Sequence, residues 1–199
     1  LHPRVRRQRQ MCIRDRIKDV ESDDAFIQAL TAPDFCTKYS SPEKNYFYWK
    51  YENYLRRTEQ PVATPMTHED LRQKENKKLV MTIEHIVAQS NSGEKSKVIT
   101  DALKIDVGSV EVFDEKYLNS IGNLTLDPQS ANSSKGKKDV DEKNSKYFAK
   151  APYKCQNELE EFMIDDVWTL ESIKKRKAKL LTFAKELWCN FDFVKVLRV

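Results

Sequence analysis

Histidine, cysteine and long apolar runs are all scarce in this 199-residue chain, and each scarcity excludes a class of protein. Three histidines and four scattered cysteines, with no Cys-x-x-Cys pair, argue against a zinc site and against a disulfide framework. Unpaired thiols are typical of a reducing cytoplasm, where we expect the protein to act. No stretch approaches the roughly eighteen consecutive apolar residues that a membrane span needs, so we expect no membrane partner.

The basic excess of the chain is confined to its first sixteen residues. The formal net charge is +4, from 35 basic and 31 acidic residues. Residues 1–16 hold six arginines and one aspartate, so 29 basic and 30 acidic residues remain elsewhere, a net charge of −1. This segment contains MCIRDR, which resembles the translation of a sequencing-library adapter, and we expect residues 1–16 to be a non-native leader. A basic nucleic-acid-binding arm and a mitochondrial-type leader are the alternatives.

Helices are expected in the first part of the chain. Asp23–Leu30 is predicted to be a short helix, and Ser40-Ser41-Pro42 is a start signal for a longer one. Within the longer helix, Lys44–Arg57 carries an aromatic stripe, which favours core packing over a base-stacking platform. After a break at Gln60–Met66, the polar segment to Lys78 is expected to be helical.

The middle of the chain has the pattern strand, loop, strand, helix. Leu79–Ile83 is apolar and rich in β-branched residues, which predicts a strand, and it runs directly into Glu84-His85. A polar loop is expected over Gln89–Lys97. Ile121–Leu126 predicts a turn and a second strand, after which Asp127-Pro128 begins a helix.

The C-terminal third is expected to be helical, with Thr169 as an N-cap. Apolar residues then recur at helical spacing from Ile173 to Trp188 and form one stripe. Arg176 falls on the edge of this stripe. It is either half-buried with a carboxylate or phosphate partner, or extended along the surface, and the pattern leaves both open.

The side chains needed to hydrolyse a phosphodiester bond could come from Glu84, His85 and Asn132. A neutral histidine can act as a general base near pH 7. Mg²⁺ takes carboxylate and amide oxygens as ligands, with water and phosphate completing its shell. In a regular strand Glu84 and His85 point to opposite faces, so both reach one site only if the strand bends or His85 lies in the loop. Asn123 could hold that loop by hydrogen bonds.

Three segments together resemble a known family. TIEHIVAQS, NSIGNLTL and SANSSKGKK are similar to the ββα-metal (HNH, His-Me finger) nucleases, and most similar to the C-terminal nuclease domain of GmrSD-type, modification-dependent restriction endonucleases. The HNH domain of CRISPR effector nucleases has a similar pattern, including the nine-residue interval between the two asparagines. KNSKYF (143–148), WTLESIKKR (168–176) and the helix around Tyr46–Leu55 extend the resemblance to roughly residues 23–190.

The resemblance implies a role for each site residue. Glu84 and Asn132 would be ligands of one Mg²⁺ or Mn²⁺ ion, and His85 would be the general base. Asn123 would fix the loop that holds His85. The family usually has proline where this chain has Ala88, a departure that leaves the roles intact but the loop less stiff.

The resemblance also implies partners. Family members act on DNA, including DNA with modified bases in defence against phage. They usually carry an N-terminal ParB-like nucleotide-binding domain or subunit with an Asp-Gly-Gln-Gln-Arg motif, which this sequence does not contain. Phosphate contacts are expected from lysines that follow Asn132, although a solvated helix face explains them equally well. These residues are Lys135, Lys137, Lys138, Lys143 and Lys146.

We therefore expect an α+β protein that acts as a metal-dependent DNA endonuclease. A helical part (17–78) would precede a small ββα-metal core (79–150), and a helical tail (151–199) would pack on that core. Two alternatives stay open. One is a non-catalytic nucleic-acid- or protein-binding module that retains the HNH scaffold. The other is a zinc-held HNH variant, which the lack of further histidines disfavours.

Overall fold

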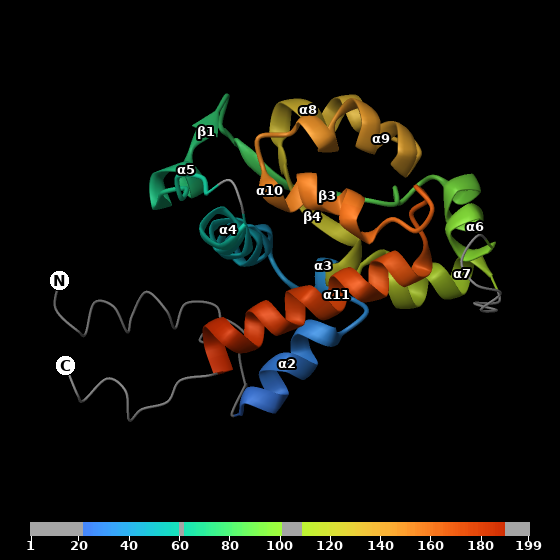
Figure 1. Cartoon of the computed structure of the whole chain (residues 1–199), viewed down its shortest axis with the longest axis horizontal. Helices are drawn as coiled ribbons and strands as arrows, with labels where there is room; N and C mark the ends of the chain where they lie inside the picture. The colour runs from blue at the N-terminus through green and yellow to red at the C-terminus, as the bar shows by residue number, and fades with distance from the viewer. Residues whose placement is uncertain (1–21, 60–61, 101–108, 190–199) are drawn as a thin grey trace, which may run out of the picture.

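The structure is a computed structural model that describes residues 22–59, 62–100 and 109–189. The expected leader, residues 1–16, lies outside these ranges. The protein is α+β, as expected, with helices arranged around one antiparallel pair of central strands (Figure 1). None of the helices in the described ranges is long and apolar enough to cross a membrane.

Helix α4 (Ser41–Thr58) supplies the centre of the larger hydrophobic core. It begins where the sequence predicts, because Ser40 forms a capping box with Glu43 and Pro42 lies in the first turn. Its aromatic stripe is buried, with Tyr48 and Tyr51 fully inaccessible to solvent. This burial confirms the prediction of core packing.

Helices α2 (Asp23–Thr31) and α11 (Leu170–Ala184) come from opposite ends of the chain and lie against each other (Figure 1). The predicted N-cap of α11 is confirmed, since Thr169 Oγ1 accepts a hydrogen bond from Ser172 N at 3.2 Å. The apolar stripe of α11 faces the same core as α4, with Leu180 and Phe183 buried.

Two of the local predictions need correction. The segment to Lys78 is helical only in α5 (His68–Arg72), and a small hairpin follows it. Asn76 and Lys77 at its tip have φ angles of 49° and 65°, the left-handed conformation that a two-residue hairpin turn requires. The Gln89–Lys97 loop is interrupted by a helix. The elements concerned are β1 (Lys74–Glu75), β2 (Lys78–Leu79) and α6 (Ser92–Thr100).

The central strands are β3 (Met81–His85) and β4 (Leu124–Pro128), paired antiparallel. Glu84 is opposite Thr125, and His85 is opposite Leu124. Helix α8 (Gln129–Lys135) follows β4 directly and packs on both strands. The predicted order of strand, strand and helix is therefore present, and the first strand extends through Glu84 and His85.

Short helical segments connect these elements, and several of them contribute to a second, smaller core around Phe113 and Trp168. The α-helical segments are α3 (Phe35–Lys38), α7 (Val110–Phe113), α9 (Val140–Lys146) and α10 (Lys154–Asn157). The 3-10 and π segments are η1 (Asp114–Leu118), η2 (Ile121–Asn123), η3 (Phe148–Lys150), η4 (Glu158–Phe162) and η5 (Lys185–Cys189).

Arg176 of α11 is fully buried beside the start of β4. Its Nη1 donates hydrogen bonds to the carbonyl oxygens of Gly122, at 3.2 Å, and of Leu124. Its Nε lies 3.5 Å from Glu158 Oε1, and Glu158 Oε2 accepts a hydrogen bond from Tyr51 at 2.8 Å. Of the two alternatives for Arg176, the structure supports burial with a carboxylate partner.

Gly122 lies so close to α11 that a side chain does not fit there. A Cβ atom would lie 2.3 Å from the carbonyl oxygen of Ile173. That oxygen belongs to the backbone of α11, so it cannot move aside without moving the helix. The glycine of the IGNLTL segment is therefore required for close packing of α11 on η2, the turn that leads into β4.

We expect Gly122→Ala to destabilise the protein. The added methyl group must push α11 away from η2, which costs about 1–3 kcal/mol for an overpacked site. Urea unfolding followed by circular dichroism measures the change. Gly93→Ala is the control, because a Cβ atom at Gly93 meets only an ordinary contact at 3.6 Å. Equal midpoints for both variants would contradict the packing argument.

Candidate functional site

The Glu84 carboxylate lies in a buried ion pair near the end of β3. Lys143 Nζ donates to Glu84 Oε1 at 2.7 Å, and to the carbonyl oxygens of His85 at 2.8 Å and Ile86 at 3.1 Å. Burial raises the pKa of the Glu84 carboxyl, and the Lys143 ammonium partly offsets this. The three donors of the ammonium are all used within the protein, so Lys143 is a partner of Glu84 and not a surface residue facing DNA.

A second buried pair lies next along the same face of the sheet. Asp127 is diagonal to Glu84 across the strand pair, and its Oδ1 accepts hydrogen bonds from Lys135 and, at 2.7 Å, from Gln156 Nε2. Lys135 is also buried. Two of the five lysines expected to contact phosphate therefore neutralise carboxylates inside the protein.

The other three lysines of that set lie nearer the surface. Lys137 and Lys146 are exposed and Lys138 is half-buried. Lys138 and Lys146 both donate to Glu142 Oε1, at 2.6 and 2.8 Å. Of the five lysines, these three are therefore the ones near the surface, in the turn after α8 and at the end of α9.

The His85 ring is held apart from the Glu84 carboxylate. Because side chains alternate along a strand, adjacent residues of β3 leave opposite faces of the sheet. His85 Nε2 lies 3.2 Å from Asn119 Oδ1. With Asn119 Oδ1 as the acceptor, Nε2 would carry the proton, and the neutral ring would keep its lone pair on Nδ1. Burial lowers the pKa of His85 to about 4.

Asn123 ties the second strand to the loop after His85. Its Oδ1 accepts a hydrogen bond from Val87 N at 3.0 Å, and its Nδ2 donates to Val87 O at 3.3 Å and Leu118 O at 2.9 Å. Its own carbonyl oxygen accepts from Ile86 N at 2.9 Å. Asn123 is fully buried, so its amide acts on the backbone and not on a ligand.

Asn132 lies in α8, the helix that packs on β3 and β4, and its side chain is outside the described part of the chain. Among the side chains that are described, no group of three or more His, Cys, Asp or Glu residues could hold a metal ion. The structure thus brings Glu84, Lys143 and the His85 carbonyl together, but it does not bring the Glu84 carboxylate to the His85 ring.

Sequence reasoning missed three contributors to this site. Asn119, which holds the His85 ring, stands at the start of the NSIGNLTL segment and could have been considered with it. The sequence pattern predicts Asp127 only as the start of a helix, and Lys143 only as a phosphate contact. Neither had a local signal for burial, because each is neutralised by a residue of another element.

We expect the His85 ring to stay neutral in the folded protein until the pH falls to about 4, because burial disfavours its charged form. An NMR titration of the imidazole resonances from pH 8 to pH 3.5 measures this, with His85→Gln used to assign the signal. A midpoint near the ordinary value of about 6.5 would contradict the buried setting of the ring.

One known protein family matches most of this chain. The model of the family "GmrSD restriction endonucleases, C-terminal domain" matches residues 20–183, which include both central strands, α8 and α11. No curated protein and no solved structure shows a significant match. Because the family model spans well over half of the chain, the protein belongs to the family of GmrSD restriction endonuclease C-terminal domains.

Proposed function

We propose that this chain is an HNH-type, metal-dependent DNA endonuclease that hydrolyses phosphodiester bonds in a modification-dependent restriction system. The observation that carries the proposal is the order of elements around the family segments. Glu84 and His85 end one strand, Asn123 bonds to the loop after them, and α8 with Asn132 packs on the same strand pair.

The proposed metal ligands are oxygen atoms, which hard divalent cations such as Mg²⁺ prefer. A buried carboxylate needs a cation beside it, and the Lys143 ammonium supplies that charge to Glu84 here. Mg²⁺ or Mn²⁺ would be held by the Glu84 carboxylate and the Asn132 amide, since such ions use few protein oxygens and complete their shell with water and phosphate. When bound, the ion would stabilise the negative charge that develops on the leaving oxygen.

The proton transfer in this proposal belongs to His85. A ring that is neutral at pH 7 can accept a proton from the attacking water, and Asn119 leaves Nδ1 free for that role. Asn123 holds the loop and thereby the ring. Because His85 and Glu84 leave opposite faces of β3, the proposal requires the backbone at this strand end to turn when DNA binds.

DNA is the proposed substrate, and the surface lysines are the proposed phosphate contacts. Lys137 and Lys138 lie in the turn between α8 and α9, close in sequence to the proposed ligand Asn132, and Lys146 is the last residue of α9. Such contacts position a duplex without selecting its sequence. Recognition of modified bases, with a ParB-like domain or subunit as partner, completes the proposed phage-defence role.

A non-catalytic DNA- or protein-binding module is the second candidate. The buried Glu84–Lys143 pair favours it, because an ammonium already compensates the carboxylate that a metal would need. The separation of the Glu84 and His85 side chains on β3 favours it as well. Cleavage assays distinguish the two candidates directly.

We expect His85→Ala to reduce cleavage of duplex DNA by about 10²–10⁴-fold, while DNA and Mg²⁺ still bind, because only the proton acceptor is lost. Plasmid nicking and gel-shift assays, with modified and unmodified DNA and with and without Mg²⁺, measure both properties. Glu111→Ala is the control, since Glu111 is exposed on α7 and has no role in the proposed site. Cleavage by His85→Ala at the wild-type rate would refute the mechanism.

The two ligand variants are expected to differ in rescue. The Asn132→Ala defect should be partly relieved by high Mg²⁺ or by Mn²⁺, because a neutral ligand is lost. The Glu84→Ala defect should resist rescue, because a carboxylate supplies charge as well as geometry. Absence of cleavage by the wild-type chain under every metal condition would favour the non-catalytic module.

We expect Lys143→Met to couple stability to Mg²⁺. Removing the ammonium leaves Glu84 buried without a counter-charge, which costs about 3–5 kcal/mol. A divalent ion at Glu84 restores the charge, so Mg²⁺ should raise the melting temperature of this variant more than that of the wild type. Lys138→Met is the control, because Lys138 pairs with Glu142 near the surface. Equal Mg²⁺ effects on all three proteins would argue against metal binding at Glu84.

A further inference from the structure

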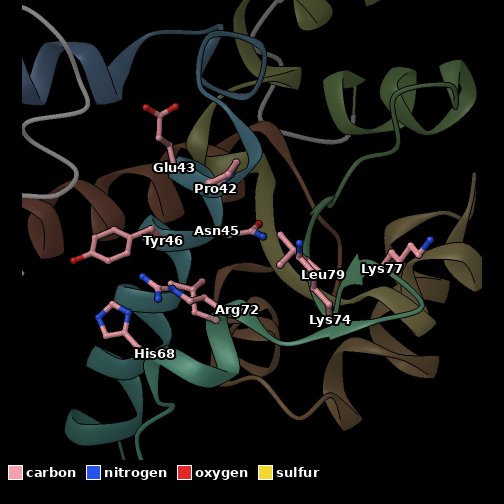
Figure 2. A pocket seen from close by; sticks show the side chains of 10 residues that line it. Pro42, Glu43, Asn45, Tyr46, His68, Arg72, Lys74, Lys77 and Leu79 are labelled. Carbon is pink, nitrogen blue, oxygen red and sulfur yellow. The ribbon is translucent and has the colours of Figure 1, made fainter.

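A cavity of about 720 Å³ lies between α4, α5 and the β1–β2 hairpin, and neither Glu84 nor His85 lines it (Figure 2). Its volume is within the range of about 300–1,000 Å³ that is typical of pockets for small organic ligands. The lining residues that matter for its chemistry are Asn45, Tyr46, His68, Arg72, Lys74 and Lys77.

Asn45 supplies a buried oxygen that has no hydrogen-bond partner in the described part of the chain. Its side chain is only 3% exposed and points from α4 toward Leu79 and Lys74 of the hairpin (Figure 2). Its Nδ2 donates to Met81 O at 2.9 Å, whereas its Oδ1 accepts no hydrogen bond from the described residues. A buried acceptor left unpaired is costly, so this oxygen favours a ligand that brings a hydrogen-bond donor.

The rim of the cavity is positively charged. Arg72, Lys74 and Lys77 are all exposed and line it. Glu43 is the acidic lining residue, and its Oε2 accepts hydrogen bonds from Ser40 N and Oγ at 2.8 and 2.6 Å in the cap of α4. A ligand with a hydrogen-bond donor for the interior and a negative charge for the rim satisfies both parts of the cavity.

We propose that this cavity binds one nucleotide of the DNA strand, with the base edge donating to Asn45 Oδ1 and a phosphate on Arg72 and Lys74. Every base has an N–H donor on its Watson–Crick edge, and the ring of His68, which is exposed on α5, offers apolar surface to its face. The proposal rests on the proposed function only in taking DNA as the source of the nucleotide.

The position of the cavity along β3 is consistent with a bound strand. Asn45 contacts Met81 at the first residue of β3, and Glu84 and His85 end the same strand. At about 3.3 Å per residue, the four steps from Met81 to His85 span roughly 13 Å. This is about four nucleotides at a rise of roughly 3.4 Å along one DNA strand.

The test is an NMR titration of the full chain in EDTA, followed on the Asn45 side-chain amide. The probes are the four deoxynucleoside monophosphates, deoxyribose 5-phosphate, inorganic phosphate and a single-stranded hexanucleotide. We expect saturable nucleotide binding at least about tenfold tighter than binding of deoxyribose 5-phosphate or phosphate, and tighter binding still of the hexanucleotide.

Arg72→Gln and Lys74→Gln should each weaken nucleotide binding by about tenfold, as expected for a lost charge-assisted contact. Lys78→Gln is the matched control, because Lys78 is exposed on the same hairpin but does not line the cavity. Equal affinity for phosphate and nucleotides, binding of mononucleotides but not of the hexanucleotide, or equal loss in Lys78→Gln would each overturn the proposal.

The outcome is independent of the cleavage assay. A chain that nicks DNA but shows no saturable nucleotide binding in EDTA overturns the nucleotide cavity and leaves the proposed nuclease intact. A chain that binds nucleotides at Asn45 but never cleaves DNA supports the proposed nucleotide site and contradicts the proposed nuclease activity.

Discussion

The buried guanidinium of Arg176 is the interaction on which the rest of the structure depends. It joins α11 to the carbonyl oxygens at the start of β4 and to the Glu158 carboxylate. Removing it would leave two buried carbonyl groups without this donor and Glu158 Oε1 without its nearest cation, although Tyr51 and Lys179 would still bond to Oε2. That loss is costlier than losing an exposed ion pair. The position of β4, set in this way, determines the register of β3 and hence where Glu84 and His85 lie.

The carboxylates around the central strands are compensated from within the fold. Lys143 neutralises Glu84, and Lys135 neutralises Asp127. Both lysines come from the helices that follow β4, so the segment after the second strand acts on the first. This arrangement lets a charged site remain folded at neutral pH, and it makes Lys143 the residue that any cation at Glu84 must displace or share space with.

Much of the candidate site was predictable because its signals are local. The start signal at Ser40 and the N-cap at Thr169 predict two helix starts that the structure confirms. The β-branched residues of Leu79–Ile83 predict the first central strand, and Ile121–Leu126 predicts a turn and the second. The hairpin before β3 was missed because its cue is short, a two-residue turn at Asn76 and Lys77. Asn119 was missed because its contact with His85 joins positions 34 residues apart.

The sequence by itself determined the order of strand, strand and helix, and the family to which the chain belongs, because backbone preferences and family motifs depend on neighbouring residues. Only the tertiary structure decided that Arg176 is buried and that Lys143 faces Glu84. It also decided that Gly122 must lack a side chain and that the Glu84 and His85 side chains leave opposite faces of one strand. The physical reason is that a charge is buried, or a side chain excluded, by atoms from distant parts of the chain. A local sequence pattern does not show which distant residues will pack against it.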